Sequence, residues 1–334
     1  MLKAAIIGFG GIARVHAQSY FELEKQGKVK LCAAYDVNEQ SFTKKTDINI
    51  STDEKSDFTF NCYTELEEML KNEDIDIIDI CSPTFLHKEL SIKMLERGYH
   101  VICEKPMATN YDDCMEMLNT AKKTGKRLMI GQCLHFFPEY EFLKETLDSG
   151  IYGKAKSAFF QRLSAPPLWG WNEWHTKKEM FGSCLADLAI HDIDMTQYLF
   201  GAPKKVFCSA KDGFGAMDGI TALLMYDNFT STIVADWSIV NGQFSSEYRV
   251  SFEKATVIDK NGVVTVYPHD GDAFNPKLSD NDGYTAEISH FADLVNGEKD
   301  HGKNHVRSAA ETIKIVNLLT ECAEEGGRIK KYDI

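Results

Sequence analysis

Short apolar runs alternate with amphipathic stretches through about residue 132 of the chain. The runs are dense in Val, Ile, Ala and Cys, as buried parallel strands are. They predict strands at residues 2–7, 29–35, 75–81, 100–103 and 127–130. The stretches between them predict helices at residues 12–26, 64–71, 86–97 and 111–124. This alternation indicates an α/β fold, a doubly wound parallel sheet with right-handed crossovers.

Two other parts of the chain have a different pattern. Residues 43–58 are polar, and we interpret them as a solvated excursion. From about residue 154, long β-type runs at 154–163, 205–210, 221–226, 230–239, 248–252 and 263–267 predict strands. Turn dipeptides at Asp227-Asn228 and Asn261-Gly262 suit hairpins. Helical patterns occupy 183–200, 285–295 and 306–324. This half therefore predicts an α+β domain with a large, mostly antiparallel sheet.

Composition adds limits to this picture. The 334 residues, 43% of them hydrophobic, are enough for two domains, which we place at residues 1–132 and 133–334. The net charge of −13 repels nucleic acid and anionic membranes. The N-terminal apolar run is too short for a signal peptide, and no apolar stretch approaches the ~18 residues of a spanning helix. We therefore expect a soluble, cytoplasmic protein.

The nine cysteines are odd in number, widely spaced and mostly set in apolar runs. This is typical of reduced, buried thiols. The only close histidine pair, His301 and His305, lies in a polar stretch, and there is no C-x-x-C motif. No metal site is expected.

A glycine-rich motif, Gly8-Phe9-Gly10-Gly11-Ile12-Ala13, follows the first predicted strand and opens a helix. In such a G-x-G-x-x-A motif, Gly8 permits a tight turn and Gly10 lets the backbone approach a pyrophosphate. Ala13 allows close packing of helix and strand, and the free N–H groups of the helix hold the anion. The alternative is a tight turn without a ligand.

Asp36 follows the second predicted strand, where a carboxylate can accept hydrogen bonds from an adenosine ribose and repel a 2′-phosphate. It predicts NAD rather than NADP as the cofactor. The alternative is that Asp36 only caps a helix at 38–45.

Three further motifs appear in order along the chain: Ser82-Pro83-Thr84-Phe85-Leu86-His87, Glu104-Lys105-Pro106 and the run from Asp187 to Asp194. With these motifs the sequence resembles the glucose-fructose oxidoreductase, inositol dehydrogenase and rhizopine catabolism family, written Gfo/Idh/MocA. The resemblance covers nearly the whole chain. It implies an N-terminal Rossmann domain, a C-terminal domain whose open sheet face forms subunit interfaces, and NAD(P)-dependent redox chemistry on sugars or polyols.

The motifs also suggest their own chemistry. Lys105 follows a buried strand, where its ammonium can stabilise an alkoxide, unless it is a solvated surface lysine. Asp187 and His191 are four apart in a helical run and therefore share a face, where the carboxylate can orient the imidazole for proton exchange. The alternative is a helix-terminal acid and a core histidine. The resemblance implies that Lys105, Asp187 and His191 are catalytic.

The resemblance also places Ser82, Pro83 and Thr84 beside the nicotinamide end of the cofactor. His87 either neighbours the cofactor or packs inside the domain, and Glu104 either lies near the nicotinamide or forms a buried ion pair. We expect Asp192 and Asp194 to face solvent or the domain interface.

The sequence departs from the family pattern at two places. Phe181-Gly182-Ser183 replaces a glycine triplet, and His135 stands where relatives often have an arginine. The first departure predicts a differently shaped pocket, and the second puts substrate recognition by that arginine in doubt. We predict that His135, Trp171 and Trp174 contact substrate, the aromatic rings by stacking on a sugar face. Core or interface packing is the alternative for the two tryptophans.

The leading hypothesis is an NAD-dependent dehydrogenase that acts on a sugar, an inositol-like polyol or a sugar derivative, and that forms a homodimer or homotetramer. One alternative is an enzyme that cycles NAD during elimination or glycoside cleavage. The other is a non-catalytic dinucleotide-binding sensor.

Overall fold

The chain divides into two compact units. In the computed structural model, residues 1–43, 59–168, 171–239 and 244–333 are described. One unit comprises Met1–Phe136 and Asn281–Ala310, and the other comprises Phe137–Asp280 and Glu311–Ile334. Most of the polar excursion predicted at 43–58 lies outside the described residues.

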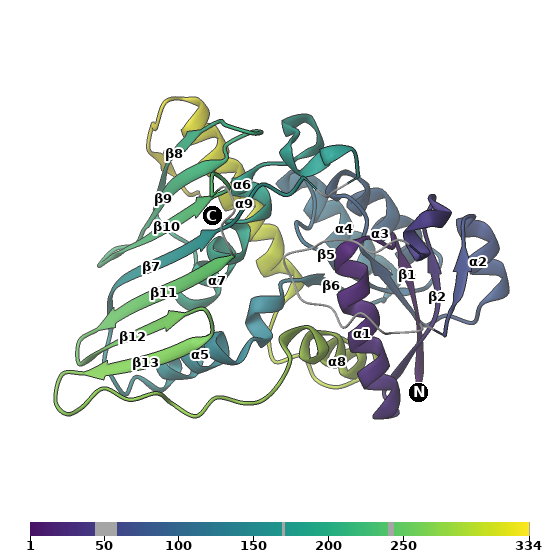
Figure 1. The fold of residues 1–334 in the computed structure, drawn as a ribbon, viewed down its shortest axis with the longest axis horizontal. Helices are drawn as coiled ribbons and strands as arrows, with labels where there is room; N and C mark the ends of the chain where they lie inside the picture. Colours follow the sequence, from purple (N-terminus) through teal and green to yellow (C-terminus); the bar gives the residue numbers. More distant parts are fainter. Residues whose placement is uncertain (44–58, 169–170, 240–243, 334) are drawn as a thin grey trace. The chain divides into compact units, whose positions relative to one another are not determined.

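The first unit is built on a six-stranded parallel sheet with the order β3-β2-β1-β4-β5-β6 (Figure 1). Its strands are β1 (Leu2–Ile7), β2 (Val29–Tyr35), β3 (Asn61–Tyr63), β4 (Ile77–Ile80), β5 (His100–Glu104) and β6 (Leu128–Gly131). Its helices are α1 (Gly11–Lys25), α2 (Leu66–Asn72), α3 (His87–Glu96), α4 (Tyr111–Thr124) and α8 (Gly283–Val295). This is the strand order of a doubly wound nucleotide-binding sheet, so the predicted fold of this half is confirmed.

Local signals set the ends of these helices. The Asn110 side chain accepts a hydrogen bond from the Asp113 N–H at 2.9 Å and so caps the start of α4. Gly125 ends the same helix in the left-handed region, with φ of 68°. The predicted and observed helices therefore agree there.

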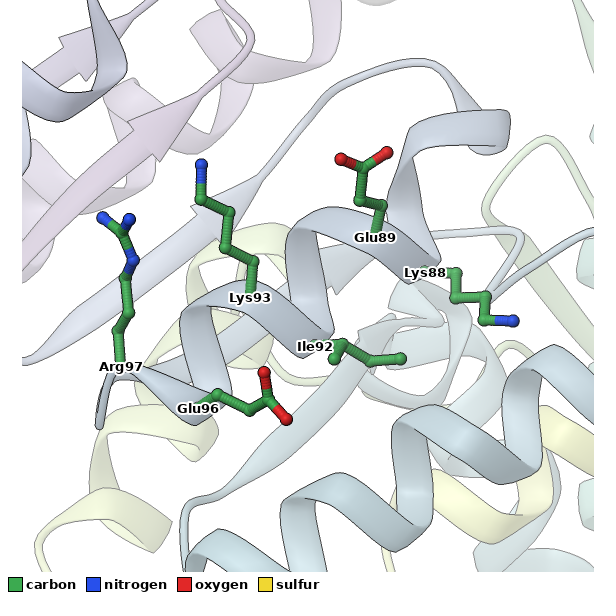
Figure 2. Close-up of a pocket in the computed structure, with 6 residues that line it drawn as sticks. All are labelled: Lys88, Glu89, Ile92, Lys93, Glu96 and Arg97. Atoms are coloured by element: carbon green, nitrogen blue, oxygen red, sulfur yellow. The ribbon is translucent and has the colours of Figure 1, made fainter.

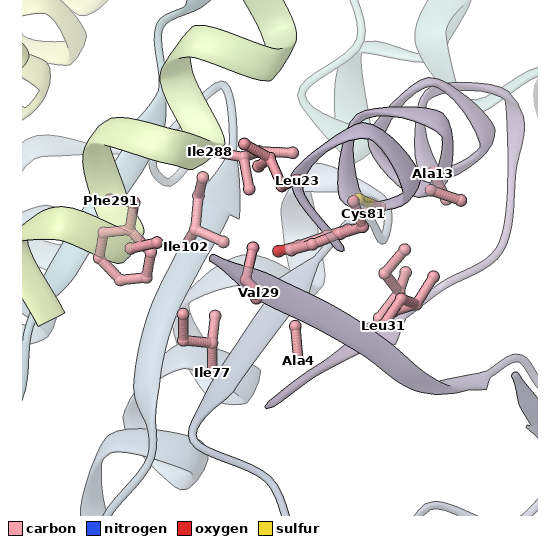
Figure 3. Packing of buried hydrophobic residues seen from close by; sticks show 14 of the residues in the cluster. Ala4, Ala13, Leu23, Val29, Leu31, Ile77, Cys81, Ile102, Ile288 and Phe291 are labelled. Atoms are coloured by element: carbon pink, nitrogen blue, oxygen red, sulfur yellow. The ribbon is translucent and has the colours of Figure 1, made fainter. Parts of the chain in front are cut away.

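One cluster of core residues in this unit lies between its sheet and helices α1 and α8. Ile288 and Phe291 of α8 are buried with Leu23 of α1 and with Val29 and Ile102 of the sheet (Figure 3). Residues 281–310 therefore belong to the first unit, although the expected second domain, 133–334, contained them. Burial of an apolar helix face decides this assignment, and periodicity alone does not show which sheet that face covers.

The second unit contains an eight-stranded sheet with the order β13-β12-β11-β7-β10-β9-β8-β14. Its strands are β7 (Ala155–Leu163), β8 (Lys205–Lys211), β9 (Gly219–Met225), β10 (Thr230–Asp236), β11 (Ser245–Phe252), β12 (Ala255–Lys260), β13 (Val263–Pro268) and β14 (Lys330–Lys331). Neighbouring strands are antiparallel except β7 and β10, which are parallel. The predicted hairpins at Asp227-Asn228 and Asn261-Gly262 join β9 to β10 and β12 to β13, and the mostly antiparallel sheet is confirmed.

Helices of the second unit pack on one face of this sheet. They are α5 (Pro138–Ser149), α6 (Cys184–Asp187), α7 (Ile190–Phe200) and α9 (Val306–Glu324), of which the first turn of α9 belongs to the first unit. The Tyr248 hydroxyl of β11 donates to the Glu139 carbonyl of α5 at 2.7 Å. The Cys322 thiol of α9 accepts a hydrogen bond from the Cys208 N–H of β8 at 3.0 Å. Along each strand, buried residues alternate with half-buried or exposed ones on the opposite face.

Two further findings concern the whole of the described chain. All nine cysteines are free thiols, and seven of them are buried. Among the residues that the structure describes, no helix is both long and apolar enough to cross a bilayer.

Candidate functional site

The polar motifs of the first unit lie at the carboxyl ends of three neighbouring strands. Gly8 follows β1, Ser82 lies just after β4, and Lys105 follows β5. Strand β1 lies between β2 and β4, so the strand order reverses beside it. Ligands of doubly wound sheets bind in the crevice at this point of reversal. The first unit therefore presents its candidate residues where a cofactor is expected.

The loop after β1 has the shape that a dinucleotide requires. Gly8 has φ of +87°, and a Cβ there would lie 2.9 Å from the Cys81 carbonyl oxygen. A Cβ at Gly10 would meet nothing within 4 Å. No side chain caps the start of α1, where Gly11 and Ile12 are half-buried, and its first turn holds no acidic residue. The N–H groups of that turn therefore suit a pyrophosphate, and the residues present fit NAD(P).

The two glycines should respond differently to alanine. We expect Gly8→Ala to lower the melting temperature, because its φ is positive and its Cβ would contact backbone atoms. We expect Gly10→Ala to leave the melting temperature nearly unchanged and to weaken NAD binding at least about 10-fold, because the added methyl group occupies space that a pyrophosphate needs. Thermal unfolding and NAD titration measure both effects. Full NAD affinity in Gly10→Ala would contradict the assigned phosphate site.

Two other residues of the motif are buried and pack beneath the loop. Phe9 is buried and packs against the rings of Phe42 and Phe60, with centroids 5.5 and 5.3 Å away. Ala13 is also fully buried, so a larger side chain would separate α1 from the sheet.

Asp36 joins this loop to the end of β2. Its Oδ2 accepts the Phe9 N–H at 2.7 Å, and its Oδ1 accepts the Asn38 N–H at 2.8 Å and the Ser41 hydroxyl at 3.1 Å. The turn that follows is a short 3-10 helix, Glu39–Phe42. The end of the helix considered for 38–45 lies outside the described residues. Each carboxylate oxygen has two lone pairs, so Oδ2 can accept a further hydrogen bond from a ribose hydroxyl.

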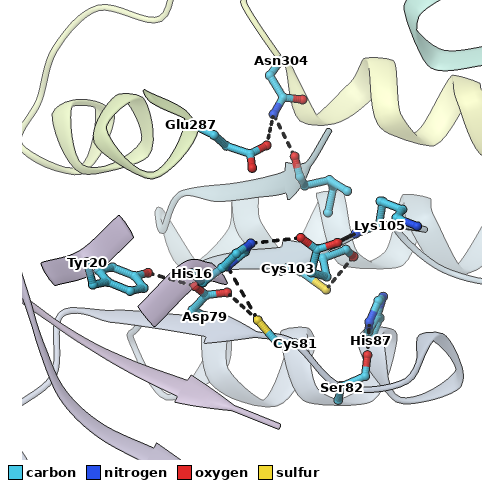
Figure 4. A network of polar contacts seen from close by, with 12 residues as sticks. His16, Tyr20, Asp79, Cys81, Ser82, His87, Cys103, Lys105, Glu287 and Asn304 are labelled. Carbon is cyan, nitrogen blue, oxygen red and sulfur yellow. Dashed lines mark hydrogen bonds and ion pairs between the residues drawn. The ribbon is translucent and has the colours of Figure 1, made fainter. Parts of the chain in front are cut away.

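The segment after β4 is held by His87. His87 is 1% exposed, and its Nδ1 and Nε2 each lie 2.7 Å from a carbonyl oxygen, of Pro106 and Ser82 respectively (Figure 4). Both ring nitrogens are therefore occupied by backbone, which favours packing over direct contact with a cofactor. Pro83 is half-buried, and the buried hydroxyls of Ser82 and Thr84 have no hydrogen-bond partner among the described residues, which suits a polar ligand.

Lys105 differs in burial from its neighbours in β5 and the loop that follows. It is half-buried, whereas every other residue from Val101 to Ala108 is buried. Its N–H donates to Oε2 of Glu104 at 3.1 Å, and Oε1 of Glu104 lies 3.1 Å from Nε2 of His16. Of the two expectations for Glu104, the structure therefore shows the buried ion pair. The Lys105 side chain points away from that pair (Figure 4).

In the second unit, Asp187 and His191 are likewise half-buried residues within a buried run. Between Cys184 and Thr196 these two are the half-buried residues, and all others are buried. The helix predicted at 183–200 is divided, because the N–H groups of Leu188 and Ala189 both donate to the Cys184 carbonyl and interrupt the regular ladder. Widened turns of this kind are frequent at functional sites. Asp187 thus ends α6, and His191 lies in the first turn of α7.

The expectation that Asp192 and Asp194 face solvent or the domain interface is wrong. Asp192 is fully buried and lies 3.1 Å from Nε of Arg162 on β7. Burial raises the pKa of Asp192 to about 6, although Arg162 opposes this shift. Asp194 accepts the Thr312 hydroxyl of α9 at 2.8 Å. Both carboxylates therefore anchor α7 within its own unit, whereas His191 of the same helix is half-buried.

The aromatic segment lies against the start of α6. A Cβ at Gly182 would be 2.2 Å from the carbonyl oxygens of both Trp174 and His175, so glycine is required there. The Trp174 and His175 rings stack with centroids 3.9 Å apart. Trp171 lies in the same 3-10 helix, Trp171–Thr176. This segment adjoins the helix of Asp187, as a substrate role for Trp174 requires.

His135 lies in the interior of the first unit. It is 2% exposed, within the buried 3-10 helix Cys133–Phe136 of the first unit. Its contact with substrate stays a prediction.

A shallow hollow of about 540 Å³ lies on the outer surface of α3 (Figure 2). Lys88, Glu89, Lys93 and Arg97 contribute charged side chains to it. Lys88 pairs with Asp113 at 2.6 Å, and Arg97 pairs with Glu67 at 2.7 Å. None of the candidate residues lines this hollow, so we do not assign the reaction to it.

The fold and the loop after β1 define a nucleotide-binding protein of the Rossmann class. Family models agree: "Oxidoreductase family, NAD-binding Rossmann fold" matches residues 2–132, and "GFO/IDH/MocA C-terminal domain" matches residues 140–258. Together they match 250 of the 334 residues. The chain therefore belongs to the Gfo/Idh/MocA family of oxidoreductases.

Relatives within this family differ in their named activities. The chain is 28% identical over 229 residues to a 2,7-anhydro-N-acetylneuraminate hydratase of Mediterraneibacter gnavus. The aligned part covers 64% of this chain and 56% of the relative. The chain is 30% identical over 203 residues to the D-glucoside 3-dehydrogenase of Escherichia coli, with coverages of 60% and 55%. The chain thus matches about half the length of these relatives.

A solved structure of a levoglucosan dehydrogenase in complex with NADH and levoglucosan shares the fold. Its TM-score is 0.82 at 18% identity, and 99% of each chain is covered. At this identity the similarity shows the fold alone.

Proposed function

We propose that this protein is an NAD-dependent dehydrogenase that oxidises a CH–OH group of a sugar, an inositol-like polyol or a sugar derivative. The observation that carries the proposal is that Lys105, Asp187 and His191 are half-buried within runs of otherwise buried residues. Buried neighbours fix such side chains, so their polar ends are positioned for a ligand. Membership of the oxidoreductase family supports the same reaction class.

Each of the three side chains has a distinct role in this proposal. When bound, NAD would supply the hydride acceptor for the carbon that carries the hydroxyl group. His191 takes the hydroxyl proton, and Asp187 orients His191 and favours its protonated form. The Lys105 ammonium stabilises the alkoxide that develops on the substrate oxygen. The reverse reduction uses the same groups.

A screen of sugars and polyols with NAD and NADP, followed by absorbance at the NADH wavelength, tests this proposal. We expect steady formation of NADH with at least one cyclic polyol, sugar or sugar derivative. Absence of NADH formation across the screen, with intact NAD binding, would contradict it.

The second candidate is a reaction in which NAD is reduced and then regenerated within one turnover. The relative named as a hydratase favours keeping this candidate. Such an enzyme consumes substrate without net release of NADH. Measuring product and NADH in the same reaction separates the two functions.

We further propose that NAD binds more tightly than NADP, because the Asp36 carboxylate would face a 2′-phosphate. Arg14 of α1 reaches the same turn and donates to the Ser41 carbonyl at 2.6 Å. Asp36→Asn is therefore expected to improve NADP affinity at least about 10-fold, since it removes the repulsion and leaves this guanidinium close by. Glu39→Gln, in the exposed part of the turn, is the matched control. Equal affinity of the native protein for both cofactors would refute the preference.

The open face of the second sheet supports a proposal about assembly. Phe207, Leu223, Thr232 and Phe159 lie side by side across four strands on the face opposite the helices. Three of these four side chains are apolar, and an apolar row on an open sheet face suits a second copy of the chain. We expect a homodimer or homotetramer by light scattering, and Leu223→Arg should shift the mass toward the monomer. A native monomer at micromolar concentration would contradict this expectation.

A further inference from the structure

A buried histidine lies between two carboxylates behind Lys105. His16 of α1 is 0% exposed, with Nδ1 2.8 Å from Oδ2 of Asp79 and Nε2 3.1 Å from Oε1 of Glu104 (Figure 4). Asp79 comes from β4 and Glu104 from the end of β5. His16 thus connects the first helix of the sheet to the two strands that precede the candidate cofactor segments.

Two carboxylates beside the ring favour the charged form of this histidine. Nδ1 is hydrogen-bonded to Asp79, whereas the 3.1 Å contact of Nε2 with Glu104 is an ion pair without hydrogen-bond geometry. Burial by itself lowers the pKa of His16, but Asp79 and Cys81 oppose it, and the pKa lies well above its usual value. The Tyr20 hydroxyl also donates to Asp79, at 3.1 Å, and the ring of Tyr284 lies 6.4 Å from the imidazole.

These groups are spaced as hydrogen-bond partners of one another. His16, Asp79 and Cys81 bring metal-binding residue types within 4.8 Å of each other. Two nitrogen or oxygen ligands of a tetrahedral zinc ion are about 3.3 Å apart. The 2.8 Å between Nδ1 and Oδ2 is shorter and is a hydrogen-bond distance.

Glu104 has little freedom to move. Its Oε1 faces His16, and its Oε2 accepts the N–H of Lys105. On a third side lies Gly131 of β6, where an added Cβ would come within 2.9 Å of Oε1. The carboxylate therefore links the imidazolium of His16 to the backbone of the residue that carries the candidate ammonium.

We propose that His16 is a positioning residue for Lys105. It acts through Glu104. The imidazolium orients the Glu104 carboxylate, and the carboxylate accepts the Lys105 N–H and so fixes the backbone position from which the lysine side chain extends. The inference rests on the proposed function only in assigning Lys105 to the substrate. A displacement of about 1 Å at a reacting group can lower a rate up to about 100-fold, so such support has a measurable effect.

A double-mutant cycle tests this connection. We expect His16→Gln and Glu104→Gln each to lower kcat about 10–100-fold with a smaller change in KM, and the double variant to be no worse than the more damaging single variant. Tyr20→Phe is the matched control, because it removes a hydrogen bond to Asp79 from the same helix and leaves the contact with Glu104. Its kcat should stay within about twofold of the native value. Multiplying effects in the double variant would overturn the proposal.

His16→Gln leaves two buried carboxylates without a cation, which is costly and can prevent folding. In that case the comparison of Glu104→Gln with the double variant tests the connection. Glu104→Gln keeps the imidazolium beside Asp79, and the double variant leaves one buried carboxylate without a cation instead of two. Equal kcat values in these two variants support the proposal. A further loss on adding His16→Gln would show that His16 does not act through Glu104.

Two measurements on the cofactor-loaded protein do not depend on finding a substrate. Histidine ¹⁵N spectra at pH 8 should show His16 with both nitrogens protonated, and a neutral ring would contradict the charged bridge. Exchange of the Lys105 amide hydrogen should be faster in Glu104→Gln and in the double variant, and unchanged in Tyr20→Phe. Unchanged exchange in all of them would overturn the positioning role even if the dehydrogenase is confirmed.

Discussion

Replacing His191 by alanine is expected to lower kcat by at least about 100-fold on the true substrate, the usual scale for loss of a general base. NAD affinity should change little, because His191 belongs to the second unit and the dinucleotide motif to the first. Steady-state kinetics at saturating NAD, together with NAD titration, measure both quantities.

The control for this substitution is His269→Ala. His269 is an exposed histidine of the same unit, beside Asp270, and its removal should leave kcat unchanged. If His191→Ala kept near-normal turnover with an unchanged pH profile, the proton-transfer role of His191 would have to be abandoned.

The second large effect is expected at Lys105. Lys105→Ala should also lower kcat at least about 100-fold, because it removes the ammonium that stabilises the developing alkoxide. Some loss of NAD affinity is compatible with this role, since Lys105 follows a strand of the cofactor-binding sheet. The loss in kcat should nevertheless be the larger of the two.

Lys93→Ala is the matched control for Lys105. Lys93 lies on the outer side of α3 in the same unit and pairs with Glu67 at 3.1 Å. Its removal should affect neither kcat nor NAD affinity. A Lys105→Ala protein that retained native kcat would show that this lysine is a surface residue without a catalytic role.

Elements with strong local signals could be predicted from the sequence. Strands β1 and β2 and helix α4 have the predicted bounds, because alternation of apolar runs and capping residues acts over a few positions. Helix α5 was missed, although Pro138 at its start and Gly150 at its end are ordinary helix signals. Strand β3 has only three residues, which is too short for a periodic pattern.

Sequence motifs predicted only part of the candidate site. The glycines of the first loop and Lys105 lie where the sequence placed them, at strand ends. His16 was missed, although Asp79 inside the apolar strand β4 was a usable signal, since a buried carboxylate requires a partner. The identity of that partner depends on the packing of α1 against β4 and β5.

The sequence by itself determined the two kinds of sheet, the dinucleotide loop and the family, because each is encoded by neighbouring residues or by a motif of fixed spacing. Only the tertiary structure decided that α8 completes the first unit, that Asp192 and Asp194 are buried anchors, and that His16 bridges Asp79 and Glu104. These features join residues that are far apart in the chain. Their energies come from burial and pairing of charges in a packed interior, and local pattern carries no information about which distant group becomes the partner.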